Sequence, residues 1–172
     1  LGAGLMGHGI AYVFAASGHP VSVTDPEIGA LRSLDDRVNG IFKLLEQDSS
    51  GAGNVIAAHS FQDAVADADI VIEAAPEKLE LKQSIFVQLI KETKPGCILA
   101  SNNYGLPIGQ IAAKEAEPER IVCTHFLNPP HLVPLVEVIQ VAKTSLSVVE
   151  KMIKLLTALG KTAVHAKRDI PG

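Results

Sequence analysis

Short apolar runs along this chain alternate with longer segments in which apolar residues recur every three or four positions. The short runs predict buried strands, and the longer segments predict helices. The expected strands cover residues 21–24, 69–74, 97–100, 121–126, 135–141 and 162–166. The expected helices cover residues 10–16, 28–45, 77–93 and 147–159. This alternation predicts an α/β fold, a doubly wound and mostly parallel sheet of the Rossmann type.

Small residues predict where the helices end. Gly18 and Gly160 follow two of them, as helix C-terminal glycines do. The segment 28–45 is expected to form one long helix, which the residues 49–53 (SSGAG) interrupt. Ser147 and Glu150 have the spacing of a capping box, so the last helix should begin there.

The chain shows no internal linker, so we expect a single domain over residues 1–172. One residue precedes the first glycine, and no initiator Met is present. We therefore expect the first strand of the sheet to be mostly missing, so that the chain begins as a truncated form of its domain.

Composition narrows the classes of partner. The chain is 47% hydrophobic but only 4% aromatic, which suits an aliphatic core around buried strands. Its net charge is −4 with no basic run, so we expect no nucleic acid and no membrane as partner. Cys97, Cys123 and the histidines show no metal-ligand spacing, and no metal is expected. Two reduced thiols and no targeting signal agree with a cytoplasmic setting.

A glycine-rich loop opens the chain. Gly2, Gly4 and Gly7 form GxGxxG around Leu5 and Met6, directly before a helix. In dinucleotide-binding folds the first glycine permits a tight turn, the second lets a pyrophosphate approach, and the third lets helix and strand pack closely. The helix start then offers free N–H groups to the phosphates.

Asp25 ends the next expected strand at the distance where such folds carry an acidic residue. A carboxylate there accepts hydrogen bonds from the ribose hydroxyls of NAD and repels the 2′-phosphate of NADP. The other interpretation is a solvated acid at a strand end. The combination favours NAD as cofactor.

Three later segments carry further motifs: residues 72–82 (IEAAPEKLELK), 99–108 (LASNNYGLPI) and 125–139 (HFLNPPHLVPLVEVI). Together with GAGLMG at residues 2–7 and DIPG at residues 169–172, they resemble the 3-hydroxyacyl-CoA dehydrogenase family in order and spacing. The resemblance covers nearly the whole chain.

The resemblance implies a catalytic pair. His125 corresponds to the base that takes the hydroxyl proton, and Glu137 to the carboxylate that orients it. If the chain doubles back around His131, residues 125 and 137 fall opposite one another. Glu137 lies in an apolar segment, so we expect a buried carboxylate that needs a partner.

The resemblance also implies contacts to cofactor and substrate. The residues implied near the ribose and nicotinamide are Ala74, Ala75, Glu77, Lys82 and Asn102. Glu77 and Lys82 could equally be a solvated pair at a helix start. Asn128 is either a polar contact to the substrate or a turn residue before proline. His131 is either a substrate contact or an exposed turn histidine.

Two features depart from the family pattern. Tyr104 stands where the family has a serine that touches the substrate oxygen, and its larger side chain predicts a short or flat substrate. The segment between Asp25 and Asp69 is shorter than the CoA-binding arm of the family and is net acidic. Both make acyl-CoA a doubtful substrate and favour free hydroxy acids.

We therefore expect an NAD-dependent oxidoreductase acting on an alcohol, as in the fatty acid metabolism of the family. The family adds a helical C-terminal domain that completes the active site and forms a homodimer; this chain stops before it, so alone it should bind cofactor and turn over little. One alternative is a cofactor-binding or structural member without turnover. Another is an NADP-linked hydroxyisobutyrate-type reductase, which Asp25 disfavours.

Overall fold

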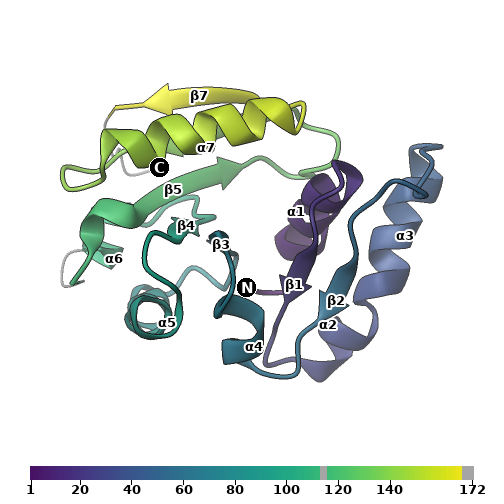
Figure 1. The fold of residues 1–172 in the computed structure, drawn as a ribbon, viewed down its shortest axis with the longest axis horizontal. Coiled ribbons are helices and arrows are strands. Elements are labelled where there is room, and N and C mark those ends of the chain that lie inside the picture. Colours follow the sequence, from purple (N-terminus) through teal and green to yellow (C-terminus); the bar gives the residue numbers. More distant parts are fainter. Residues whose placement is uncertain (113–115, 168–172) are drawn as a thin grey trace.

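The computed structural model describes residues 1–112 and 116–167, so the DIPG motif at residues 169–172 lies outside the described residues (Figure 1). Its strands are β1 (Val21–Val23), β2 (Val55–Ala57), β3 (Ile70–Glu73), β4 (Ile98–Ser101), β5 (Ile121–Phe126), β6 (Leu135–Ile139) and β7 (Thr162–Ala166). Its helices are α1 (Leu5–Ala16), α2 (Ile28–Arg32), α3 (Leu34–Leu44), α4 (Phe61–Val65), α5 (Leu79–Glu92), α6 (Ile108–Ile111), the 3₁₀ helix η1 (Pro118–Arg120) and α7 (Leu146–Ala158).

The strands form two groups, which the first two residues connect. β1 pairs with β2, and β3 to β7 pair in chain order; every pair is parallel except β5 with β6. The Gly2 amide donates to the Thr24 carbonyl, and Leu1 exchanges backbone hydrogen bonds with Ile72 and Ala74. Residues 1 and 2 thus lie between the ends of β1 and β3, and the strand order is that of the expected doubly wound fold.

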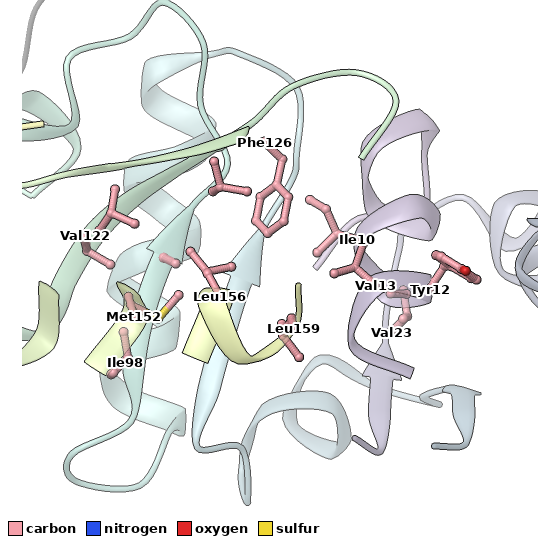
Figure 2. Packing of buried hydrophobic residues seen from close by; sticks show 14 of the residues in the cluster. Ile10, Tyr12, Val13, Val23, Ile98, Val122, Phe126, Met152, Leu156 and Leu159 are labelled. Carbon is pink, nitrogen blue, oxygen red and sulfur yellow. The ribbon is translucent and has the colours of Figure 1, made fainter. Parts of the chain in front are cut away.

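Alternate residues of the central strands enter two cores on opposite faces of the sheet. The first core contains Ile98, Val122 and Phe126, which pack with residues of α1, α3 and α7 (Figure 2). The second contains Leu99, Ile121 and Cys123, which pack with residues of α5 and α6. Helices cover both faces, which confirms the predicted α/β class.

The prediction of one long helix over residues 28–45 is wrong, because the segment breaks at Ser33 into α2 and α3. The Ser33 hydroxyl donates back to the carbonyls of Gly29 and Ala30. The guanidinium of Arg37 also donates to Ala30, at 2.7 Å. These side chains occupy the Ala30 carbonyl, which a continuous helix would use for the Leu34 amide, whereas the Gly29 carbonyl still accepts the Ser33 amide.

The predicted capping box is also wrong. α7 begins at Leu146 with Ser145 as its N-cap, so Ser147 lies inside the first turn and its hydroxyl contacts that of Ser145. The helix starts earlier because the Ser145 amide is held by the carbonyl of Glu119. Short elements such as β2, α4 and α6 were not expected either, since three to five residues carry too little periodicity to be recognised.

Candidate active site

The glycine loop is shaped by two close backbone approaches. Gly2 has φ +89°, and a Cβ there would lie 2.8 Å from the Ala74 carbonyl oxygen. A Cβ on Gly7 would lie 1.8 Å from the Gly2 carbonyl oxygen, so only glycine lets α1 start so near the sheet. Gly4 faces open space, since a Cβ there would have no atom within 4 Å. The loop is therefore packed on its inner side and open on its outer side.

Two side chains hold the loop at Ala3. The Asp25 carboxylate accepts a hydrogen bond from the Ala3 amide at 2.7 Å and from the Glu27 amide at 2.8 Å. The Arg37 guanidinium donates to the Ala3 carbonyl at 2.7 Å and lies 3.3 Å from His8 Nδ1. Sequence reasoning missed Arg37, because nothing in the spacing shows that α3 lies beside this loop.

The start of α1 fits a dinucleotide phosphate. Gly4 caps the helix without a side-chain hydrogen bond, and Leu5 and Met6 follow it in the first turn. First-turn amides have no acceptor within their own helix. With the open side at Gly4 and the Asp25 carboxylate beside the loop, the residues present suit a pyrophosphate and an adenosine ribose.

A buried polar network lies under the ends of β3 and β4. Lys82 and Glu73 are both 0% exposed, and the Lys82 ammonium lies 2.7 and 2.8 Å from the two carboxylate oxygens of Glu73. The Ser101 hydroxyl donates to the same carboxylate at 2.7 Å, and so does the Ala75 amide at 2.6 Å. Lys82 is thus neither solvated nor paired with Glu77, and it acts on the Ala74–Ala75 segment through Glu73.

His125 and Glu137 are register partners in the antiparallel β5–β6 pair, which confirms the predicted juxtaposition. His125 Nδ1 lies 2.9 Å from a carboxylate oxygen of Glu137. The His125 side chain is 15% exposed and that of Glu137 is 43% exposed, so the expectation of a buried Glu137 is wrong. The reason is that the residues which alternate with Glu137, Val136 and Val138, face the first core, whereas Glu137 projects from the other face at the sheet's open end.

Tyr104 lies against His125 in the loop between β4 and α6. Their ring centroids are 5.6 Å apart, at an interplanar angle of 63°. Glu77 fixes this loop, since one of its carboxylate oxygens accepts hydrogen bonds from the amides of Tyr104 and Gly105. The Asn103 side chain closes the turn by donating to the Leu106 carbonyl.

Asn102 connects the ends of three strands. The backbone amide of Asn102 donates to the Glu73 carbonyl at 2.6 Å, and its side-chain oxygen accepts a hydrogen bond from the backbone amide of Phe126 at 3.0 Å. Asn102 therefore sets the backbone next to His125. Asn128 is exposed in the bend that follows β5, which suits the turn interpretation.

His131 is not an exposed turn histidine. Its Nδ1 atom is buried without a hydrogen-bond partner among the described residues, and its ring lies 6.1 Å from that of Tyr12. Burial lowers the pKa of His131, and the charges of His8 and Lys161 lower it further. Lys161 donates to the carbonyls of Pro130 and Val133 and so anchors this loop.

A cavity of about 670 Å³ lies between β1 and β3, with Gly2, Gly7 and Ala74 among its lining residues. His125 and Tyr104 do not line it, so the proposed chemistry belongs to the open end of the sheet and not to this cavity. Within the described residues, no group of three or more His, Cys, Asp or Glu could hold a metal ion. No helix in the described part is both long and apolar enough to cross a membrane.

Almost the whole sequence matches one protein family. Residues 1–170 match the family model of the 3-hydroxyacyl-CoA dehydrogenase, NAD binding domain. The chain belongs to this family. Both the predicted resemblance and NAD as the cofactor of the family are thereby confirmed.

Three relatives show the range of the family. An L-carnitine dehydrogenase of Streptomyces griseus is 33% identical over 100% of this chain and 52% of its own length. A 3-hydroxybutyryl-CoA dehydrogenase of Bradyrhizobium diazoefficiens is 36% identical over 99% of this chain and 60% of its own. The crystal structure of 5-formyl-3-hydroxy-2-methylpyridine 4-carboxylic acid 5-dehydrogenase, an NAD⁺-dependent dismutase, has a TM-score of 0.92 and 32% identity over 99% of this chain and 57% of its own. The chain thus spans little more than half the length of these relatives.

Proposed function

We propose that this domain is the cofactor-binding and base-supplying half of an NAD-dependent dehydrogenase that oxidises a hydroxyl group. The observation that carries the proposal is the His125–Glu137 pair, held in register at the end of the sheet where Asn102 and the Ala74–Ala75 segment also lie. Family membership supplies the reaction class, and the domain geometry supplies a base suited to it.

Proton transfer follows from the hydrogen bonds of His125. A carboxylate only accepts hydrogen bonds, so in the neutral imidazole Nδ1 carries the hydrogen and donates it to Glu137. This leaves Nε2 as the acceptor for the substrate hydroxyl proton. The resulting imidazolium is stabilised by the charge of Glu137. NAD, when bound beside this base, would supply the hydride acceptor for the carbinol carbon.

The cofactor would be held by residues that the geometry brings together. The first-turn amides of α1 and the loop from Gly2 to Gly7 would bind the pyrophosphate, and Asp25 the adenosine ribose. Ala74, Ala75, Glu77 and Asn102 would border the nicotinamide ribose. Lys82 would contribute through its hold on Glu73.

The substrate would be a short hydroxy acid and not an acyl-CoA. Residues 27–48, which include α2 and α3, carry more acidic than basic side chains, and such a surface is a poor host for CoA phosphates. The exposed carboxylates are those of Glu27, Asp35, Asp36, Glu46 and Asp48, against the basic side chains of Arg32, Arg37 and Lys43. Tyr104 beside His125 shortens the space for a long chain. As in the family, a helical C-terminal domain would complete the pocket and form the homodimer, and the two cysteines, buried as thiols, suit work in the cytoplasm.

The full-length protein tests the proposal. NADH formation should be detectable with at least one member of a panel of hydroxy acids and hydroxyacyl-CoAs. A His125→Ala variant should bind NAD as the wild type does and lose about 10²- to 10⁴-fold in kcat. Full activity in that variant would exclude His125 as the base, and a panel without any turnover would favour a member that binds cofactor without catalysis.

A further inference from the structure

We propose that Lys161 is a positioning residue for the reaction: it holds the turn between β5 and β6 and thereby keeps the His125–Glu137 pair in place. The inference rests on the proposed function, because it adds a residue that serves the same base. Among the described contacts, Lys161 bonds to neither member of the pair. Its effect on the reaction would pass through the turn.

The turn between β5 and β6, residues 127–134, determines how the two strands align. His125 is the last residue but one of β5, and Glu137 is the third residue of β6. The two residues are register partners in the antiparallel pair. Because both lie so near the turn, a displacement of the turn would move the imidazole relative to the carboxylate that orients it.

Lys161 holds the second half of this turn by its backbone. The Lys161 ammonium donates to the carbonyls of Pro130 and Val133, the latter at 3.1 Å. The amide of the next residue, Thr162, donates to the Pro134 carbonyl at 2.9 Å. All three acceptors are backbone groups, so the hold does not depend on the side chains of the turn.

The backbone of Lys161 is itself fixed by the end of α7. Gly160 follows this helix with φ +78°, and its amide donates to the Thr157 carbonyl at 3.0 Å. The Lys161 amide donates to the Leu156 carbonyl at 2.9 Å, which completes a Schellman motif. The ammonium therefore projects from a well-anchored helix end.

The other side of the turn packs against α1, the helix whose start would bind the cofactor pyrophosphate. A Cβ on Gly9 would lie 3.1 Å from Pro130 Cδ and 3.5 Å from His131 Nδ1, so the turn closely approaches the helix backbone. The rings of His131 and Tyr12 also meet, with centroids 6.1 Å apart. The turn is thus held between α1 and Lys161, and its position relates the base to the cofactor helix.

The charge of Lys161 is used for these hydrogen bonds alone. In the part of the chain that the structure describes, Lys161 forms no ion pair. Burial lowers the pKa of Lys161, because it removes water from the charged ammonium. A half-buried ammonium without a carboxylate costs stability unless neutral acceptors satisfy it. The turn carbonyls are those acceptors, so removing the ammonium would release the turn.

Lys161→Met in the full-length enzyme is the first test. We expect kcat on the best substrate of the hydroxy acid and hydroxyacyl-CoA panel to fall about 10- to 100-fold, as a displacement of about 1 Å would give, with Kd for NAD within about twofold. Lys154→Met is the matched control, because Lys154 is exposed on α7 and makes no described side-chain hydrogen bond; its kcat should equal that of the wild type.

The outcomes of this comparison are distinct. An unchanged kcat in Lys161→Met, or an equal loss in Lys154→Met, would overturn the inference and leave the proposed function standing. A wild-type enzyme that turns over no member of the panel would count against both. Full activity in His125→Ala would remove the base, and with it any reason to position it.

A second test separates positioning from stability. Val148→Ala removes buried volume at the far end of α7 from Lys161, so it should lower the melting temperature and leave kcat within about twofold at assay temperature. In a Glu137→Gln background, Lys161→Met should lower kcat less than about threefold, because the alignment that it protects has already lost its charge. A kcat loss in Val148→Ala like that of Lys161→Met, or an equal fractional loss with and without Glu137→Gln, would contradict the inference. Thermal unfolding of each variant verifies that the protein is folded.

Discussion

The ammonium of Lys82 lies 2.7 Å from a carboxylate oxygen of Glu73, and protein encloses both side chains completely. This pair joins α5 to the end of β3, and the same carboxylate holds Ser101 and the Ala75 amide. Ala75 belongs to the segment expected beside the nicotinamide ribose. The ion pair is therefore a support of the cofactor site.

Removing the cation of this pair should destabilise the domain strongly. Lys82→Met leaves the Glu73 carboxylate buried and unpaired, so we expect the free energy of unfolding to fall by about 3–5 kcal/mol. The double variant Lys82→Met/Glu73→Gln should recover part of that loss, because no buried charge remains. Urea unfolding of the three proteins measures both effects. A double variant less stable than Lys82→Met would contradict this account.

Glycine substitutions separate packing from cofactor access. Gly7→Ala places a methyl group 1.8 Å from the Gly2 carbonyl oxygen and should abolish NAD binding through a displaced helix. Gly4→Ala meets no atom within 4 Å, so the domain should fold normally while NAD binds more weakly. Gly29→Ala, in equally open space within α2, is the matched control and should bind NAD as the wild type does. Calorimetric titration with NAD compares the three.

Arg37 is expected to hold the glycine loop. Arg37→Met removes the hydrogen bonds to Ala3 and Ala30, and should weaken NAD binding while lowering the free energy of unfolding by about 1–3 kcal/mol. Arg32→Met serves as the control, because Arg32 ends the neighbouring helix α2 and makes no such hydrogen bonds among the described contacts. If both variants bind NAD equally well, Arg37 has no part in the cofactor site.

Glu137 should act on the reaction and not on cofactor affinity. Glu137→Gln retains a hydrogen-bond acceptor for His125 Nδ1 and removes the charge that stabilises the imidazolium. In the full-length enzyme we expect kcat to fall about 10- to 10³-fold with the Kd for NAD unchanged. Stopped-flow measurement of NADH formation with bound NAD isolates this step. A changed Kd with unchanged kcat would place Glu137 in cofactor binding instead.

His131 gives stability a pH dependence. Because burial lowers its pKa below the usual 6.5, the folded state favours the neutral ring, and the unfolded state takes up a proton first as pH falls. The stabilisation is therefore full above about pH 6.5 and is lost as pH drops toward the lower pKa of the folded state. Melting temperatures of wild type and His131→Gln should converge on acidification. A constant difference between them would contradict this.

Features that depend on local periodicity were predictable from the sequence. The central strands and α5 follow from their apolar patterns, and the opposition of His125 and Glu137 follows from one reversal between them. Features that depend on tertiary neighbours were not. The break at Ser33 depends on Arg37, and Arg37 in turn depends on α3 lying beside the glycine loop. The exposure of Glu137 depends on where the second core ends, since Ile139 on the same face of β6 packs against that core and Glu137 lies outside it.

The antiparallel pairing of β5 with β6 makes the base and its carboxylate partner a self-contained module. Both residues and the turn that aligns them are encoded within one hairpin, so recombination could move the proton-accepting unit between scaffolds without dividing it. The same arrangement makes the unit sensitive to small indels: one residue added within β6 would turn Glu137 to the opposite face of the sheet. Substitutions that keep the length and shape of the turn between the two strands would leave the pair aligned. Variation in substrate can therefore accumulate in that turn while the chemistry stays fixed.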